Sequence, residues 1–503
     1  MSLETDILRT SAAAPPSEHF DVLIVGAGMS GIGSAYHLAA RLPGLRFVIL
    51  EARESFGGTW RVHRFPGARS DTDLYTYGFS FKPWSGLPIA TAPEILNYMD
   101  EAIAENDLAR HIRYGHRIET AQWSSADALW TIEARRAEPQ DIARFTARFF
   151  WMCGGYYRHD DPYTPDWPGL AQFAGRILHP QAWPADADLA GKRVVVIGSG
   201  ATAATLVPAI ASECSHVTML QRTPIYYRVG RNAIDRLADE LQALEIDPRW
   251  VHEILRRKVL RETGIFIRRT FSEPDVTRQE LLAGVRAHLG DDPESARHFE
   301  PDYRPWRQRV GYLPDGELFR GVASGRVSVV TGRIEHFTPA GIQLACGRHI
   351  DADIVVTATG FHLSAMGDIA FSIDGAPVTW ADAVTYRGVM FAGVPNFASV
   401  FGYLRASWTL RVELVADFVC RLLEEMDARG ARAVRVVLPP DADTLPRRPW
   451  VEPDNFNPGY LARGVHVLPR SLDRPEWRHS HDYWEDCETW PAIDIGAAPF
   501  SYS

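Results

Sequence analysis

Several features that would assign the chain to a common class are scarce or missing. Its 503 residues include only five cysteines, which are scattered and never form a C-x-x-C pair. They are Cys153, Cys214, Cys346, Cys420 and Cys487. This usage predicts reduced thiols in a cytoplasmic protein, and it argues against both a disulfide framework and a cysteine metal site.

Charge and hydrophobicity exclude further classes. The 53 basic and 63 acidic residues give a net charge of −10, which favours neither nucleic acid nor anionic lipid as a partner. No apolar run in the sequence approaches the roughly 18–20 residues needed to span a bilayer. Residues 1–18 lack the segments of a secretory signal, so we expect a mobile tail there. An apolar fraction of 46% is typical of a globular protein.

A β-α-β pattern stands near the N-terminus. An apolar run at 22–25 predicts a buried parallel strand, a helical apolar repeat follows, and a second strand is predicted at 47–50. The first turn carries a G-x-G-x-x-G motif, formed by Gly26, Gly28 and Gly31. These glycines would let backbone N–H groups approach a pyrophosphate at a helix N-terminus. Glu51 ends the second strand, where its carboxylate can accept ribose hydroxyls, so we predict a dinucleotide site.

The same pattern recurs in the middle of the chain, with strands predicted at 194–197 and 217–220. The turn between the first strand and an Ala-rich helix reads Gly198-Ser199-Gly200-Ala201-Thr202-Ala203. In place of the acid, the second strand ends at Arg222, with Thr223 beside it. A guanidinium can bind a 2′-phosphate that a carboxylate would repel, so we predict NADPH rather than NADH. An exposed arginine without a ligand is the open alternative.

Two dinucleotide sites in one chain predict electron transfer from NADPH to a bound flavin. By analogy with two-domain flavoproteins, the N-terminal site is assigned to FAD. A disulfide reductase would need a pair of redox cysteines, which the sequence lacks. Oxygen is therefore the expected electron acceptor.

The fold class that follows is α/β, with two Rossmann-like dinucleotide-binding domains and a helical insert in the second. The expected boundaries are a tail at 1–18, the first part of the FAD domain at 19–155, the NADP domain at 156–360, its helical insert at about 231–300, and the second part of the FAD domain with a C-terminal wrap at 361–503. Apolar runs at 149–155 and 354–360 predict strands near the domain crossings.

Two further helical regions are predicted. The insert is basic, and the usual meaning of such a cluster is a solvated helix face, with a membrane-surface role as the weaker alternative. Apolar residues that step by four predict one amphipathic helix from Ser407 to Ala428. Beyond Pro439 the sequence has little periodicity, which predicts an irregular C-terminal segment.

A family fingerprint lies at 173–184. The stretch reads F-x-G-x-x-x-H-x-x-x-W-P, with Phe173, Gly175, His179, Trp183 and Pro184 at its fixed positions. It resembles the fingerprint of Baeyer–Villiger monooxygenases, which belong to the class B flavoprotein monooxygenases. The stretches at 57–71, 305–309 and 358–360 also resemble that family, and the resemblance covers about residues 20–475. Within the family, the chain is similar to the actinobacterial ethionamide-activating monooxygenases at 198–203, 221–222 and 406–410.

The resemblance implies a set of cofactor and catalytic residues. It implies FAD contacts from Ser30, Glu51, Thr59, Trp60, Arg61, Val62, Asp71 and, through its backbone, Ile118. It implies NADP contacts from Arg69, Ser70, Gly198, Ser199, Gly200, Ala201, Thr202, Ala203, Arg222 and Thr223. It places the active-site arginine at Arg309, with Asp71 close to it, and it implies no metal.

The implied reaction uses NADPH, FAD and dioxygen to insert oxygen into a ketone, giving an ester or lactone. Arg309 would stabilise the flavin C4a-peroxide anion and the tetrahedral adduct, and Asp71 would orient Arg309. From the residues alone, a domain-interface salt bridge is the alternative role for Arg309. Two other functions stay open: a flavin N- or S-oxygenase acting on sulfides, thioamides or amines, and a non-oxygenating FAD reductase.

Other positions have a structural interpretation or depart from the family pattern. His179 is expected in the linker between domains, without a catalytic role, and Trp183 is expected to pack. Trp408 either approaches the flavin or only begins a helix. Gln308 stands where many Baeyer–Villiger enzymes have lysine, which removes one cation from the NADP phosphate site. Arg307 replaces an acidic residue of the nearest group, so the substrate need not match theirs.

Overall fold

The larger of two main sheets is assembled from segments that lie far apart in the chain. The computed structural model describes residues 17–138, 140–290 and 293–503; the tail expected at 1–18 falls mostly outside them, and Glu18 already belongs to a strand. Within this part the sheet has nine strands, in the order β20-β19-β4-β5-β6-β1-β2-β3, with β23 paired to β6. Their bounds are β1 Glu18–Val25, β2 Phe47–Leu50, β3 Ile112–Arg113, β4 Arg117–Ser124, β5 Leu129–Arg135, β6 Ile142–Met152, β19 Ala370–Ile373, β20 Ala376–Pro377 and β23 Phe397–Ser399.

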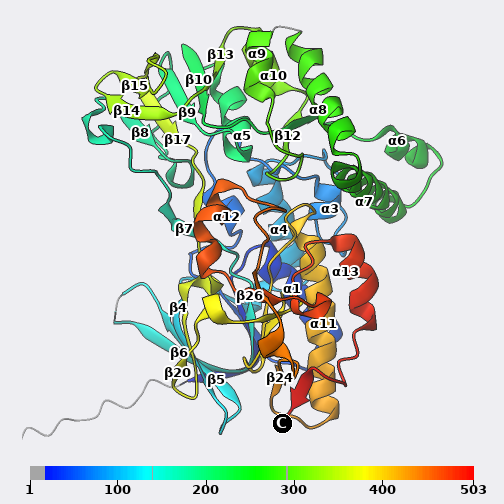
Figure 1. Cartoon of the computed structure of the whole chain (residues 1–503). Coiled ribbons are helices and arrows are strands. Elements are labelled where there is room, and N and C mark those ends of the chain that lie inside the picture. The colour runs from blue at the N-terminus through cyan, green and yellow to red at the C-terminus, as the bar shows by residue number, and fades with distance from the viewer. Residues whose placement is uncertain (1–16, 139, 291–292) are drawn as a thin grey trace, which may run out of the picture.

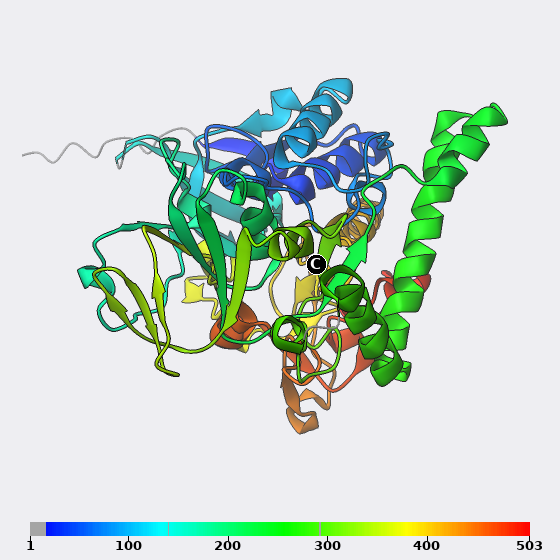
Figure 2. The same cartoon turned by 90° about the horizontal axis from the view of Figure 1, so that it is seen from above.

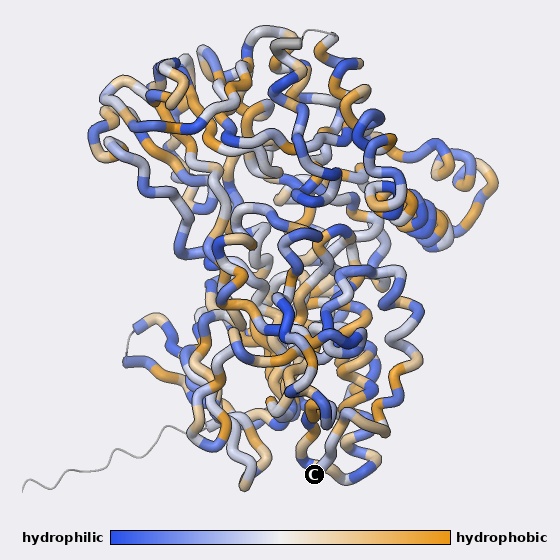
Figure 3. The backbone as a smooth tube through the Cα atoms, in the orientation of Figure 1, coloured by the Kyte–Doolittle hydropathy of each residue, from blue (hydrophilic) through white to orange (hydrophobic). Residues whose placement is uncertain are grey.

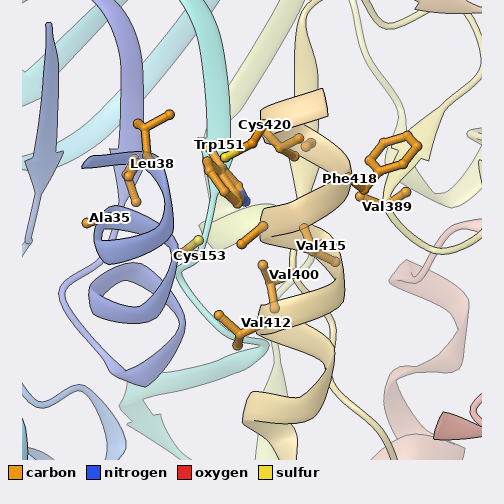
Figure 4. Packing of buried hydrophobic residues seen from close by; sticks show 14 of the residues in the cluster. Ala35, Leu38, Trp151, Cys153, Val389, Val400, Val412, Val415, Phe418 and Cys420 are labelled. Atoms are coloured by element: carbon orange, nitrogen blue, oxygen red, sulfur yellow. The ribbon is translucent and has the colours of Figure 1, made fainter. Parts of the chain in front are cut away.

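The centre of this sheet is the first predicted β-α-β unit. β1 is paired in parallel with β2 and β6, and Val22, Leu23 and Ile24 are fully buried, as expected of a strand covered on both faces. Helix α1 (Met29–Arg41) returns from β1 and packs against the long helix α11 (Trp408–Ala428). Figure 4 shows Leu38 of α1 and Val412 of α11 on facing sides of this core. The helix predicted at 407–428 is confirmed, with Ser407 as its N-cap residue.

The second sheet contains the second predicted unit. Its strands are all parallel, in the order β13-β10-β9-β17-β8. Their bounds are β8 Arg176–Leu178, β9 Arg193–Ile197, β10 His216–Gln221, β13 Val327–Thr331 and β17 Ile354–Thr357. Helix α5 (Ala201–Ile210) follows β9 directly, and α10 (Glu317–Ala323) precedes β13. Two parallel β-α-β units with helices packed on them confirm the predicted α/β fold with two Rossmann-like units.

Two adjacent connections join the sheets. The chain leaves β6 and forms β7 (Tyr157–Pro162), and it returns after β17 as β18 (Phe361–Leu363). β7 and β18 pair antiparallel, so the outgoing and returning segments lie side by side. In Figure 1 the second sheet lies above this crossing and the first sheet lies below it. The strands predicted at both crossings are therefore present as β6 and β17.

The helical insert projects from the side of the molecule, as Figures 1 and 2 show. It comprises α6 (Arg236–Ala243), α7 (Pro248–Ser272) and α8 (Pro274–Leu289). Hydrophilic residues predominate along α7 in Figure 3. The prediction of a solvated basic face is nevertheless wrong for Arg256, which is buried. Its guanidinium is buried, donates to Tyr75 O at 2.9 Å and pairs with Glu413 of α11 at 3.1 Å. This arginine therefore fastens the insert to the first unit.

The C-terminal segment runs back over both units in short pieces. They are β24 Val434–Val436, β25 Arg447–Pro449, α12 Gly459–Gly464, β26 Arg470–Leu472, α13 Tyr483–Thr489 and β27 Phe500–Tyr502. In Figure 1, α12 lies near the crossing and α13 lies beside α11. Across the described ranges, no helix is both long enough and apolar enough to traverse a bilayer.

Candidate active site

A cavity of about 560 Å³ extends from the first glycine turn to the crossing between the sheets. Its size lies within the range typical of ligand and cofactor pockets. Predicted site residues in its lining are Gly26, Gly28, Ser30, Glu51, Thr59, Trp60, Ser70, Asp71, Ile118 and Arg309. All but one of them come from separate segments of the first unit. The exception is Arg309, which lies just before β12 (Gly311–Pro314). The fold therefore brings most of the predicted FAD residues and both catalytic candidates to one cavity.

The first turn requires glycine for steric reasons. Gly26 has φ +91°, a conformation that L side chains rarely adopt. A Cβ on Gly31 would lie 1.8 Å from Gly26 O, so the start of α1 can pack on the turn only without a side chain there. A Cβ on Gly58 would lie 3.3 Å from Gly28 Cα, so two bare backbones face each other at the N-terminus of α1. This arrangement suits the close approach of a pyrophosphate.

Glu51 is tied to the same turn. Its carboxylate accepts hydrogen bonds from the backbone N–H groups of Ala27 at 2.8 Å and Arg53 at 2.9 Å. Burial raises the pKa of Glu51, and these two hydrogen bonds oppose the rise. A carboxylate offers about four acceptor positions, so capacity remains for the ribose hydroxyls of a nucleotide. Glu51 thus fits the role predicted for it.

Two hydrogen bonds fix the wall beside the turn. Trp60, in α2 (Thr59–Val62), donates its indole N–H to the hydroxyl of Tyr77 at 2.9 Å. Trp408 donates its indole N–H to Ser30 Oγ at 2.7 Å and also lines the cavity. Trp408 is therefore both the first residue of α11 and part of the cavity wall, and its approach to a flavin stays a prediction.

Arg309 and Asp71 meet within the cavity. Arg309 Nε lies 2.8 Å from Asp71 Oδ2, and Arg309 Nη2 donates to Asp71 Oδ1 at 3.2 Å. This forked contact holds the guanidinium plane in one orientation. The negative charge of Asp71 raises the pKa of Arg309 further, so the cation is permanent. The pair also joins the two units, so the domain-interface salt bridge is present, and the active-site role of Arg309 stays a prediction.

The second glycine turn is equally constrained. Gly198 has φ +139°. A Cβ there would lie 2.3 Å from the carbonyl oxygen of Ala358, the residue that follows β17. A Cβ on Gly200 would meet no atom within 4 Å, so the N-terminus of α5 faces open space. Ser199 Oγ donates to Thr223 O at 3.2 Å, which ties the turn to the end of β10. Ala201, Thr202 and Ala203 form the first turn of α5.

Arg222 and Arg69, both predicted NADP contacts, differ in their surroundings. Arg222 is exposed, and within the described ranges no hydrogen bond or ion pair engages it. Arg69 instead pairs with Glu317 at 2.9 Å, at the start of α10. Arg61 donates to Phe56 O at 3.3 Å, outside the cavity lining. Gly31 and Val62 also lie outside that lining.

Three tyrosines in the cavity were missed by sequence reasoning. Tyr156 and Tyr157 follow β6, and Tyr460 belongs to α12. The hydroxyls of Tyr156 and Tyr157 lie 2.8 Å apart, and the Tyr156 ring stacks on Trp408 with centroids 5.4 Å apart. Burial raises the pKa of all three phenols well above their ordinary value, so they stay protonated. The available signal was the Gly154-Gly155-Tyr156-Tyr157 sequence at the carboxyl end of a parallel strand.

The fold defines a class: α/β proteins with two dinucleotide-binding units, here joined by the Arg309–Asp71 pair in the wall of the cavity. Comparisons with known proteins agree. The model of the family described as "Flavin-binding monooxygenase-like" matches residues 20–240. The chain is 42% identical over 474 residues to the FAD-containing monooxygenase EthA of Mycolicibacterium smegmatis, covering 93% of this chain and 94% of that relative. The chain therefore belongs to the flavin-binding monooxygenase family.

Solved structures show the same architecture. An oxidized steroid monooxygenase bound to NADP superposes with a TM-score of 0.75 at 24% identity, covering 96% of this chain and 99% of that one. An open crystal structure of cyclohexanone monooxygenase gives a TM-score of 0.72 at 23% identity, covering 97% and 100%. At these identities the two structures support the fold alone.

Proposed function

We propose that this protein catalyses the NADPH- and O2-dependent Baeyer–Villiger oxidation of ketones to esters or lactones, with FAD as its bound cofactor. The observation that carries the proposal is the Arg309–Asp71 pair in the cavity that begins at the first glycine turn. The name of the relative, an FAD-containing monooxygenase, supports the use of FAD and oxygen. A cytoplasmic location stays a prediction from the cysteine usage.

The residues around the first turn fit FAD. The turn from Gly26 to Gly31 would receive the pyrophosphate, and Glu51 would accept the ribose hydroxyls. Ser30, Thr59, Trp60 and the backbone of Ile118 would complete the contacts. Bound FAD supplies the chemistry that reduces and activates dioxygen. We further propose that residues 19–155 and 361–503 form the FAD domain, and that 156–360 form the NADP domain with its insert at about 231–300.

The second unit would hold NADPH. The turn from Gly198 to Ala203 would present backbone N–H groups to the pyrophosphate, and Arg222 would offer its exposed guanidinium to the 2′-phosphate. Ser70 lines the main cavity next to Asp71, which would bring the reactive end of NADPH toward the same site. Arg69 could contribute only if its pair with Glu317 opened or was shared.

Arg309 would act on the substrate. A ketone carbonyl that is attacked at carbon gathers negative charge on its oxygen, and a fixed guanidinium lowers the energy of that state. Asp71 keeps the donor groups of Arg309 in place, so little reorganisation is needed when the charge develops. The cavity walls, formed in part by Tyr156 and Trp408, would limit access of water.

The test compares Arg309→Ala with Arg41→Ala, which also removes an ion-paired arginine but on the surface. Each variant is assayed with linear, cyclic and aryl ketones and with a sulfide, scoring product mass, NADPH loss and hydrogen peroxide release. Arg309→Ala should lower ketone oxidation by about 10²-fold or more, whereas Arg41→Ala should match wild type. Wild-type ketone turnover in Arg309→Ala would refute the proposal. Sulfide oxidation without ketone oxidation in the wild-type enzyme would establish the N- or S-oxygenase alternative.

A further inference from the structure

Arg463 has no role in the reaction described so far. It lies beside the segment that follows β17 in the second unit. It belongs to α12, the same short helix that carries Tyr460 into the main cavity. Its guanidinium carbon lies 3.6 Å from the centroid of the Tyr163 ring, and its Nη2 donates to Thr359 O at 3.4 Å. Stacking and one backbone contact therefore hold the cation in a set position.

The platform beneath Arg463 is itself fixed. Thr359 Oγ1 donates to Tyr163 O at 2.7 Å, and the ring of His179 lies 3.3 Å from the same carbonyl oxygen. Burial lowers the pKa of His179, which keeps the imidazole neutral. The fingerprint histidine thus has the structural role expected of it, and that role includes fixing the loop on which Arg463 stacks.

This platform adjoins the second glycine turn. Thr359 and Ala358 follow β17, and Ala358 O is the atom that a Cβ on Gly198 would strike. On the other side of this turn, Ser199 Oγ donates to Thr223 O, next to Arg222, at 3.2 Å. Burial lowers the pKa of Arg463, and the positive charge of Arg222 lowers it further. In the parts of the chain that the structure describes, neither guanidinium forms an ion pair with a carboxylate. Two arginines near one another without an acid create a strong preference for an anion.

We propose that Arg463 and Arg222 together bind the 2′-phosphate of NADPH, so that a residue of the C-terminal segment helps to select the nicotinamide cofactor. The inference rests on the proposed use of NADPH. Among the described residues, the guanidinium of Arg463 donates one hydrogen bond, to Thr359 O, so most of its five N–H donors are available to the phosphate.

The experiment measures binding rather than turnover. Isothermal titration calorimetry on the FAD-loaded full chain compares adenosine 2′,5′-bisphosphate with 5′-AMP, two probes that differ only in the 2′-phosphate. The variants are Arg463→Gln, Arg463→Lys and Arg222→Gln. Arg435→Gln is the matched control, because it removes an exposed guanidinium from β24 of the same C-terminal segment.

Arg463→Gln should weaken the binding of adenosine 2′,5′-bisphosphate by about 10- to 100-fold, which corresponds to the loss of a charge-assisted hydrogen bond. The affinity for 5′-AMP should stay unchanged. Arg463→Lys should retain part of the affinity for the bisphosphate, and Arg435→Gln should bind both probes as the wild type does. Equal weakening of both probes, or no weakening of either, would overturn the assignment of Arg463. In that case, if Arg222→Gln no longer bound the bisphosphate more tightly than 5′-AMP, the proposed use of NADPH would still be supported. A wild-type protein that binds both probes equally would instead refute the proposed NADPH site itself.

Discussion

Trp408 donates its indole N–H to the hydroxyl of Ser30 across a 2.7 Å contact that joins the first turns of α11 and α1. The two residues are separated by 378 positions in the chain. Ser30 lies in the turn proposed to bind the FAD pyrophosphate, and Trp408 stacks on Tyr156 in the cavity wall. Helix α11 therefore contributes to the proposed cofactor site, which segments from the two halves of the chain complete together.

Removal of the indole donor should weaken FAD retention. In Trp408→Phe the aromatic packing largely remains, but Ser30 loses its partner, so we expect a lower FAD-to-protein ratio after purification and about a 5- to 10-fold weaker affinity for added FAD. The absorbance spectrum and fluorescence titration of the apoprotein measure these quantities. A double-mutant cycle with Ser30→Ala is the control, since the two losses should not add if they remove the same hydrogen bond.

Neutralising Asp71 should impair the reaction more than it impairs the fold. Asp71→Asn keeps the size of the side chain but weakens the forked contact that orients Arg309. We expect ketone oxidation to fall by about 10- to 100-fold and hydrogen peroxide release per NADPH to rise, with unchanged FAD content. Product mass and peroxide assays on the same sample provide the measurement. If coupling stayed at the wild-type level, Asp71 would have no orienting role.

Much of the fold follows from local patterns in the sequence. The strands predicted at 22–25 and 194–197 lie within β1 and β9, because a short apolar run that ends at glycine specifies a buried parallel strand and its turn. The helix at 407–428 was equally predictable from its period. The burial of Arg256 was not, because its partner Glu413 is 157 residues away and no local pattern encodes that contact.

Some residues of the candidate site could also be predicted from local motifs, and others could not. Motif spacing located both glycine turns, Glu51 and Arg309, since each sits at the end of a predicted strand or in a family motif. The cluster of Tyr156 and Tyr460 depends on α12 folding back over the crossing between the sheets. The stacking of Arg463 on Tyr163 depends on the same long-range contact. Such contacts are determined by tertiary packing, which a single sequence does not reveal.

FAD affinity should depend on pH through Glu51. Burial raises the pKa of this carboxyl above its ordinary value of 4.5, and ribose hydroxyls donate to its ionised form. Binding therefore favours the deprotonated state, so affinity should fall as pH is lowered through the raised pKa. Titration of the apoprotein with FAD between about pH 5 and pH 7.5 would show the decline. In Glu51→Gln the affinity should be weaker and its dependence on pH flatter; an equally steep curve in that variant would exclude Glu51 as the titrating group.

The largest loss of stability is expected at a buried ion pair beneath the C-terminal segment. Arg411 of α11 is 0% exposed and pairs with Asp486 of α13, which also accepts hydrogen bonds from Tyr403 at 2.8 Å and Trp490 at 3.1 Å. Asp486→Asn would leave the guanidinium buried without its counter-charge, which costs about 3–5 kcal/mol. Asp417→Asn, which weakens an exposed pair with Arg41, should cost about 1 kcal/mol or less. Thermal unfolding at one scan rate compares the two variants, and similar shifts would show that the Arg411–Asp486 pair does not anchor this segment.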